Sequence, residues 1–165
     1  MQILPLLLKE LDYETEVARK MLALVPTDKF DWKPHPKSTS MKHLAVHIGE
    51  LPSWITMGLN TTEMDFETSP YTPTPVENTA DLLGLLERSY ESGKASLNNA
   101  KEENLLPNWT LRSGKQVYSV MTKYELIRHC LNQITHHRAQ LGVYLRLLNI
   151  PIPGSYGPSA DEMNS

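Results

Sequence analysis

The stretch Thr122–Leu148, TKYELIRHCLNQITHHRAQLGVYLRLL, predicts one long helix with a single apolar stripe and gives the strongest indication of the fold. Thr122 and Glu125 form the T-x-x-E pattern of a capping box, which is typical of a helix N-terminus. The apolar residues that follow recur at helical spacing: Ile127, Leu131, Ile134, Leu141, Leu145 and Leu148. This helix is expected to be the longest in the protein.

Three earlier segments carry the same periodicity. They are Leu4–Val25, Met41–Ile55 and Thr79–Ala100. Pro26 ends the first helix, Ser40 is a suitable N-cap for the second, and Pro52 predicts a kink within the second. Four long helices without a convincing sheet predict an all-α protein, a four-helix bundle. At 165 residues the chain is expected to form a single domain over residues 1–165.

The connections are less regular. The Thr- and Pro-rich stretch Gly58–Asn78 is expected to be a loop, and a short hairpin is a weaker prediction within Asn104–Ser119, just before the last helix. The tail Asn149–Ser165, with three prolines and two glycines, is expected to run as an irregular C-terminal strap over the surface.

Charge and composition narrow the function. Lys and Arg total 16 against 19 Asp and Glu, a net charge of -3, and no basic run occurs, so we expect no nucleic-acid partner. The most apolar N-terminal stretch, Ile3–Leu8, is broken by Pro5, so we expect it to be neither a signal peptide nor a membrane span. The one cysteine, Cys130, cannot form an internal disulfide, and cytoplasmic localisation is expected.

Histidines near the apolar stripes are the candidate metal ligands. A rotation of about 100° per residue places His47 roughly 80°, His137 about 60° and Gln133 about 100° from the centre of the stripe of their helix. Gln133 and His137 share one face, four residues apart, and His47 can join them from the facing helix. Imidazoles from facing helices suit a metal site. His43 with His47 and His137 is a second candidate trio, and hydrogen-bonded structural histidines are the alternative to both.

Other residues are candidates for a pocket. Trp54 and Tyr144 lie on the same flanks as His47 and His137, where they either wall a pocket or pack in the core. Arg138 projects about 40° from the apolar centre, so its guanidinium needs a partner. That partner is either an acid on a neighbouring helix or an anionic substrate group. Gln140 is a further candidate, while Cys130 is expected to be a buried small hydrophobe.

Two stretches resemble the DinB/YfiT-like family of proteins. They are MKHLAVHIGELPSW at residues 41–54 and, more specifically, HHRAQLGVYLR at residues 136–146. The tail IPIPGSYGPSADE at residues 150–162 is similar to one branch of that family. With the order of the helices, the resemblance covers nearly the whole chain. It implies a four-helix bundle, commonly a homodimer, with a divalent metal held by histidines of the second and last helices.

Carried over by position, the family's metal ligands fall on His47, Gln133 and His137. Gln133 departs from the family pattern, which has His at that position. A neutral carboxamide oxygen is a harder ligand than imidazole, so the site is expected to be weakened, altered in metal choice or empty. Zinc or nickel is the expected metal, with iron and manganese as alternatives.

The resemblance implies a metal-dependent enzyme acting on a small molecule, of the thiol S-transferase or hydrolase type. In such an enzyme the metal activates a low-molecular-weight thiol or water as nucleophile. No residue can be assigned as general base; Glu50 is the nearest carboxylate in sequence, but it is expected to rotate further from the core than His47. The alternative is a non-catalytic binding or stress-response bundle. A DNA-acting role conflicts with the negative charge.

Overall fold

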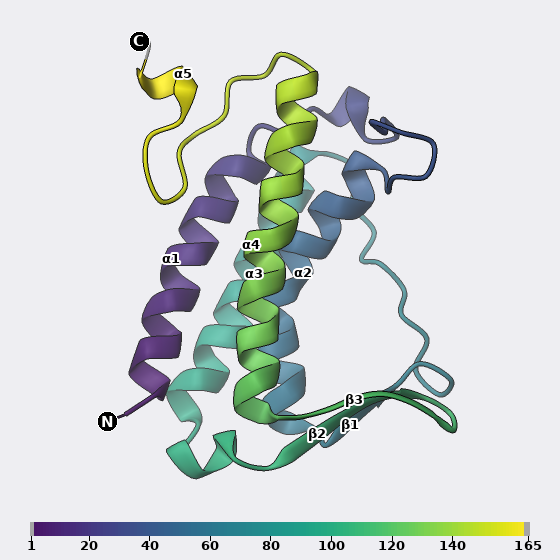
Figure 1. The fold of residues 1–165 in the computed structure, drawn as a ribbon, viewed down its shortest axis with the longest axis vertical. Helices are drawn as coiled ribbons and strands as arrows, with labels where there is room; N and C mark the ends of the chain where they lie inside the picture. The colour runs from purple at the N-terminus through teal and green to yellow at the C-terminus, as the bar shows by residue number, and fades with distance from the viewer. Residues whose placement is uncertain (1, 164–165) are drawn as a thin grey trace.

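The computed structural model describes residues 2–163, and its frame is four long helices that pack side by side (Figure 1). The helices are α1 (Leu4–Leu22), α2 (Met41–Asn60), α3 (Thr79–Asn99), α4 (Lys123–Leu147) and the short α5 (Ala160–Met163). The predicted helices are confirmed in place and order. The second helix is longer than expected: it continues past the predicted end at Ile55 to Asn60, with Pro52 inside it.

Side-chain caps fix where the helices begin. The Ser40 hydroxyl accepts from the His43 N–H at 3.2 Å, which confirms Ser40 as the N-cap of α2. The predicted capping box of α4 is also present. Glu125 N–H donates to the Thr122 hydroxyl at 3.2 Å, and Thr122 N–H donates to the Glu125 carboxylate at 2.7 Å. Each cap satisfies backbone donors that the first helical turn leaves unpaired.

The core lies between the four long helices. Each contributes fully buried aliphatic side chains at its predicted stripe, including Leu11, Ile48, Leu86 and Ile134. The helices α2 and α3 approach closely at Gly93, where an added Cβ would lie 2.5 Å from the Pro52 carbonyl oxygen. Glycine at position 93 therefore sets how tightly these two helices pack.

The all-α prediction is wrong, because the chain also forms a three-stranded mixed sheet. It contains β1 (Glu63–Asp65), β2 (Asn108–Ser113) and β3 (Gln116–Thr122), in the order β1-β2-β3. Strands β2 and β3 form an antiparallel hairpin that turns at Gly114, whose φ is +54°. Strand β1 pairs in parallel with β2, in a stretch that the sequence predicts as a loop.

A three-residue strand is too short to show an alternating pattern, so tertiary contacts decide it. Asp65 accepts from the Gly114 N–H at 2.9 Å, and Arg112 forms ion pairs with Glu63 and Asp65. The buried Trp109 donates its indole N–H to the Thr61 hydroxyl at 2.9 Å, at the end of α2. The sheet lies across the end of the bundle where α2 ends and α4 begins (Figure 1).

The C-terminal strap is not wholly irregular, since it ends in α5. It lies beside α1 and α4, far from the sheet (Figure 1). The hydroxyl of Tyr13 donates to the Ser155 carbonyl, and Arg146 pairs with Asp161 at 2.8 Å. Within residues 2–163, no helix is long and apolar enough to cross a membrane.

Candidate functional site

The structure brings His47 of α2 and His137 of α4 together. Their ring centroids are 4.8 Å apart and the rings meet edge to face at 73°. Both side chains are half-buried, whereas His43 and His136 are exposed. The rotation argument therefore identified the two histidines at the margin of the core, and the packing of α2 on α4 makes them neighbours.

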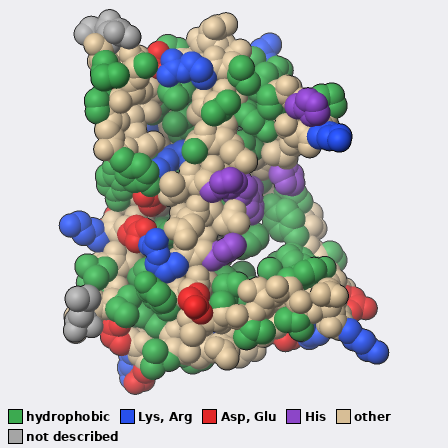
Figure 2. Space-filling model, in the orientation of Figure 1, with side chains coloured by type: hydrophobic (Ala, Val, Ile, Leu, Met, Phe, Trp, Pro, Cys, Tyr) green, Lys and Arg blue, Asp and Glu red, His purple; other side chains and the backbone are tan. Residues whose placement is uncertain are grey.

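The two imidazoles line a cavity of about 430 Å³. His43, Thr39 and Gln140 continue the polar side of this cavity, and Trp54, Phe66 and Tyr71 form an aromatic side. Histidine side chains gather on the corresponding face of the molecule, beside a hollow between the helices and the sheet (Figure 2). The volume is in the range of small-molecule sites.

Burial keeps both imidazoles uncharged at neutral pH. Desolvation, and then the neighbouring His137, lowers the pKa of His47 from 6.5 to about 4. Desolvation also lowers the pKa of His137. Neutral imidazole is the form that can accept a hydrogen bond or bind a metal ion.

Gln140 orients the ring of His137. Its carboxamide oxygen lies 2.9 Å from His137 Nδ1, and since that oxygen only accepts, Nδ1 carries the proton. The lone pair is then on Nε2, which is free to serve as an acceptor or ligand. A hydrogen bond that fixes the tautomer in this way is usual around metal-binding histidines.

Gln133 is turned away from this pair. Its carboxamide nitrogen lies 3.2 Å from His129 Nε2, and Gln133 is absent from the cavity lining. Among residues 2–163, no group of three or more His, Cys, Asp or Glu side chains is placed to hold a metal ion. The donor chemistry of His47 and His137 therefore fits a divalent metal, but a third ligand is missing in this arrangement.

Glu50 is more buried than expected from its rotation on α2. It is only 7% exposed, because the segment after β1 folds over it. Its carboxylate accepts from the Tyr71 hydroxyl at 2.6 Å, and from the Thr74 N–H and hydroxyl at 2.8 and 2.6 Å. With both oxygens occupied, Glu50 fastens this segment and is not placed as a general base for the cavity.

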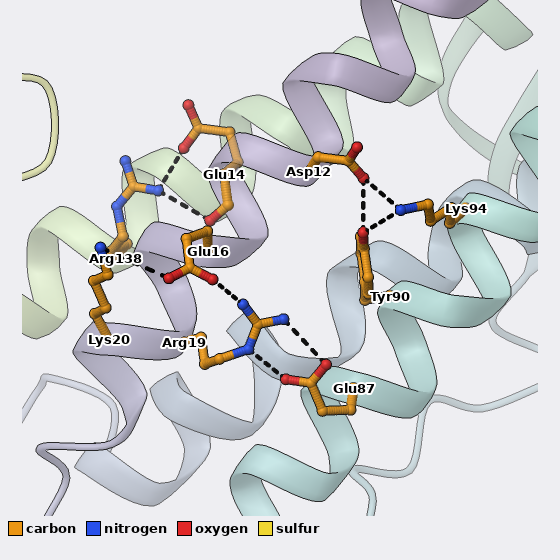
Figure 3. A network of polar contacts seen from close by, with 9 residues as sticks. All are labelled: Asp12, Glu14, Glu16, Arg19, Lys20, Glu87, Tyr90, Lys94 and Arg138. Atoms are coloured by element: carbon orange, nitrogen blue, oxygen red, sulfur yellow. Dashed lines mark hydrogen bonds and ion pairs between the residues drawn. The ribbon is translucent and has the colours of Figure 1, made fainter.

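Arg138 lies outside the histidine cavity. Its side chain is 2% exposed and forms an ion pair with Glu14 of α1, which is the structural partner that its position on α4 required (Figure 3). Tyr156 of the strap completes this network, accepting from Arg138 at 3.1 Å and donating to Glu14 at 2.6 Å. A second, mostly apolar cavity of about 420 Å³ lies beside this network, between α4 and the strap.

Tyr144 and Cys130, which are also candidates from the sequence, have structural roles. Tyr144 is buried, donates to the Thr39 carbonyl at 3.2 Å and packs edge-on against Trp32, so it supports the cavity from behind without lining it. Cys130 is fully buried, and burial raises the pKa of its thiol to about 12, which leaves it an inert hydrophobe.

Sequence reasoning missed Phe66 and Tyr71. Both come from the segment between β1 and α3, which carried no helical or strand pattern that could orient a side chain. Their only signal was the presence of large aromatic rings in a stretch otherwise rich in Thr and Pro.

Comparison with known proteins finds a matching family model and similar proteins. The family model described as the DinB family matches residues 1–164. The uncharacterized protein YrdA of Bacillus subtilis is 23% identical over 165 residues, which cover 98% of this chain and 92% of that protein.

Solved structures share the fold. A DinB-like protein of Bacillus subtilis superposes with a TM-score of 0.70 at 19% identity, over 90% of this chain and 96% of that one. A DinB-like protein of Bacillus cereus gives 0.69 at 19% identity, over 91% and 95%. A crystal structure described as a putative DinB-family member from Exiguobacterium sibiricum gives 0.66 at 18% identity, over 93% and 97%.

Proposed function

The chain belongs to the DinB family, and we therefore propose that it is a metal-dependent enzyme acting on a small molecule, of the thiol S-transferase or hydrolase type. The observation that carries the proposal is the pair of uncharged imidazoles, His47 and His137, whose ring centroids are 4.8 Å apart on the wall of one cavity. Zinc or nickel is the metal best suited to this donor set, with iron or manganese as alternatives.

His47 and His137 would hold the metal, and Gln133 would join them as a third ligand only after leaving His129. A bound divalent metal would lower the pKa of a thiol or water and so supply a nucleophile at neutral pH. The protein's own contribution is to keep both imidazoles neutral by burial and to hold His137 in one tautomer through Gln140. The carboxylate of Glu50 is engaged by Tyr71 and Thr74, so we assign no general base.

Elemental analysis of the purified protein tests this proposal. We expect close to one equivalent of metal per chain after incubation with zinc or nickel, and its loss in both His47→Ala and His137→Ala. His35→Ala is the matched control, because His35 is exposed and its ring Nδ1 accepts from the N–H of the nearby Lys37. Cobalt substitution adds a second readout, since its absorption spectrum reports the ligands directly. A protein that takes up no metal, or keeps it in both variants, would refute the proposal.

A non-catalytic binding protein is the second candidate, and the contact between Gln133 and His129 favours it. With Gln133 engaged elsewhere, two protein ligands remain, whereas catalytic zinc sites usually have three. The variant Gln133→His separates the two candidates. If Gln133→His raises metal affinity and the unaltered protein already converts thiol or ester substrates, the proposed enzymatic function is supported. If neither protein is active with any metal, the binding role is favoured.

A further inference from the structure

The aromatic side of the histidine cavity is assembled from two separate parts of the chain. Trp54 comes from α2, while Phe66 and Tyr71 come from the segment that follows β1. Trp54 meets the His47 ring at 5.4 Å and 76°, and it meets Tyr71 at 6.3 Å and 71°. The rings of Trp54 and Tyr71 therefore form a connected wall that begins at His47, and Phe66 adds a third ring to the same cavity lining.

Glu50 makes this wall a fixed part of the pocket. Three hydrogen bonds from Tyr71 and Thr74 hold the segment to its buried carboxylate. Burial and the bond to Glu50 raise the pKa of the Tyr71 hydroxyl, so it remains a donor to that carboxylate at neutral pH. Tyr71 therefore contributes its ring to the cavity, while its hydroxyl is engaged by Glu50.

The described side chains that line the cavity include no acidic or strongly basic group. Among the described residues, the lining contains no Lys, Arg, Asp or Glu. Thr39, His43 and Gln140 provide hydrogen-bonding groups in the same lining. A charged group of a ligand transferred here from water would lose hydration without gaining a charged side chain of the lining as its partner.

We propose that this cavity binds an uncharged, planar aromatic or conjugated compound, which lies against Trp54, Phe66 and Tyr71 and directs a polar group toward the histidines. The proposal rests on the proposed function, since it names the substrate class of the same site. Its evidence is independent of the metal, however, because it depends on the shape and charge of the lining residues. Stacked or edge-on ring contacts add to the burial of apolar area when a flat ligand meets such a wall.

Isothermal titration calorimetry of the full chain, treated with a chelator to remove metal, tests the proposal with four matched probes. They are 2-naphthamide, which is neutral and planar, 2-naphthoate, the 2-naphthylmethylammonium ion, and decahydro-2-naphthamide, which is neutral but not planar. We expect 2-naphthamide to bind at least about tenfold more tightly than either charged probe, and more tightly than the saturated amide. Equal binding of all four, tighter binding of a charged probe, or no binding at all would overturn the proposal.

Variants locate the binding. Trp54→Leu should weaken 2-naphthamide about tenfold, while Trp54→Phe keeps a ring and should weaken it less. Tyr124→Leu is the matched control, because Tyr124 is a partly exposed aromatic residue that lies outside this cavity. Circular dichroism shows whether each variant is folded, and loss of affinity is scored only for folded ones. Equal affinity in Trp54→Leu and Tyr124→Leu would overturn the proposal.

The two failures can be told apart. If the elemental analysis finds no metal but the chelated protein still selects 2-naphthamide, the metal-dependent function fails and the ligand class stands. If metal binds through His47 and His137 but the probes show no preference, the ligand class fails and the metal site stands.

Discussion

Removing one partner of the buried pair between Glu14 and Arg138 should destabilise the protein strongly. The two side chains are 6% and 2% exposed, so the remaining charge would have little access to water. Tyr156, which bridges both partners, would also lose a contact. A buried charge left without its partner costs about 3–5 kcal/mol, and we expect Glu14→Leu to lower the free energy of unfolding by that amount.

Urea denaturation followed by circular dichroism measures this loss. The double variant Glu14→Leu/Arg138→Met should regain most of the stability, because it removes both charges and leaves apolar groups of similar volume. The exposed pair between Glu10 and Arg128 is the matched control, with side chains 37% and 31% exposed. Glu10→Gln should cost at most about 1 kcal/mol. A loss below about 1 kcal/mol in Glu14→Leu, or a double variant no more stable than the single one, would refute this reasoning.

Three further predictions concern stability and assembly. Burial lowers the pKa of His47 from 6.5 to about 4, so the unfolded chain binds a proton in this window that the folded protein does not. The free energy of unfolding should therefore fall as pH drops from about 6.5 to about 4. Denaturation of His47→Gln at several pH values should show a weaker dependence of this free energy on pH. An unchanged dependence would contradict the lowered pKa of His47. Gly93→Ala would bring a Cβ to 2.5 Å from the Pro52 carbonyl and should cost about 1–3 kcal/mol, whereas Gly157→Ala, with open space around it, should change stability by under about 0.5 kcal/mol. Equal melting curves for these two variants would contradict that packing argument. We also propose a homodimer, so light scattering should give a mass near twice 18.7 kDa, and a particle of 18.7 kDa would exclude it.

Local signals predicted the helices well. Ser40 and the pair Thr122 and Glu125 marked two helix starts correctly, because an N-cap acts within one turn and needs only neighbouring residues. Strand β1 was missed because its partners in β2 lie 47 residues further along the chain, as in the pair Glu63 and Thr110, and no local pattern records such a contact. Elements whose backbone hydrogen bonds come from residues distant in sequence were therefore not predicted by local patterns.

The rotation argument had the same limits within the site. It identified His47 and His137, since distance from the apolar stripe determines which polar residues reach the margin of the core. It failed for Glu50, whose burial comes from Tyr71 and Thr74 rather than from its own helix. It also allowed Gln133 to turn toward His137, but in the structure Gln133 contacts His129 one turn earlier on the same helix face.

The helices, their apolar stripes and the two histidines that could meet across α2 and α4 were predictable from sequence. Those properties follow from helical periodicity and from capping, which are encoded within a few neighbouring residues. Tertiary packing was needed to show that Tyr71 and Phe66 complete the cavity, that Glu50 fastens Tyr71, and that Arg138 is paired with Glu14. Side-chain burial and hydrogen bonding depend on which segments the packed helices bring together, and those segments are far apart along the chain.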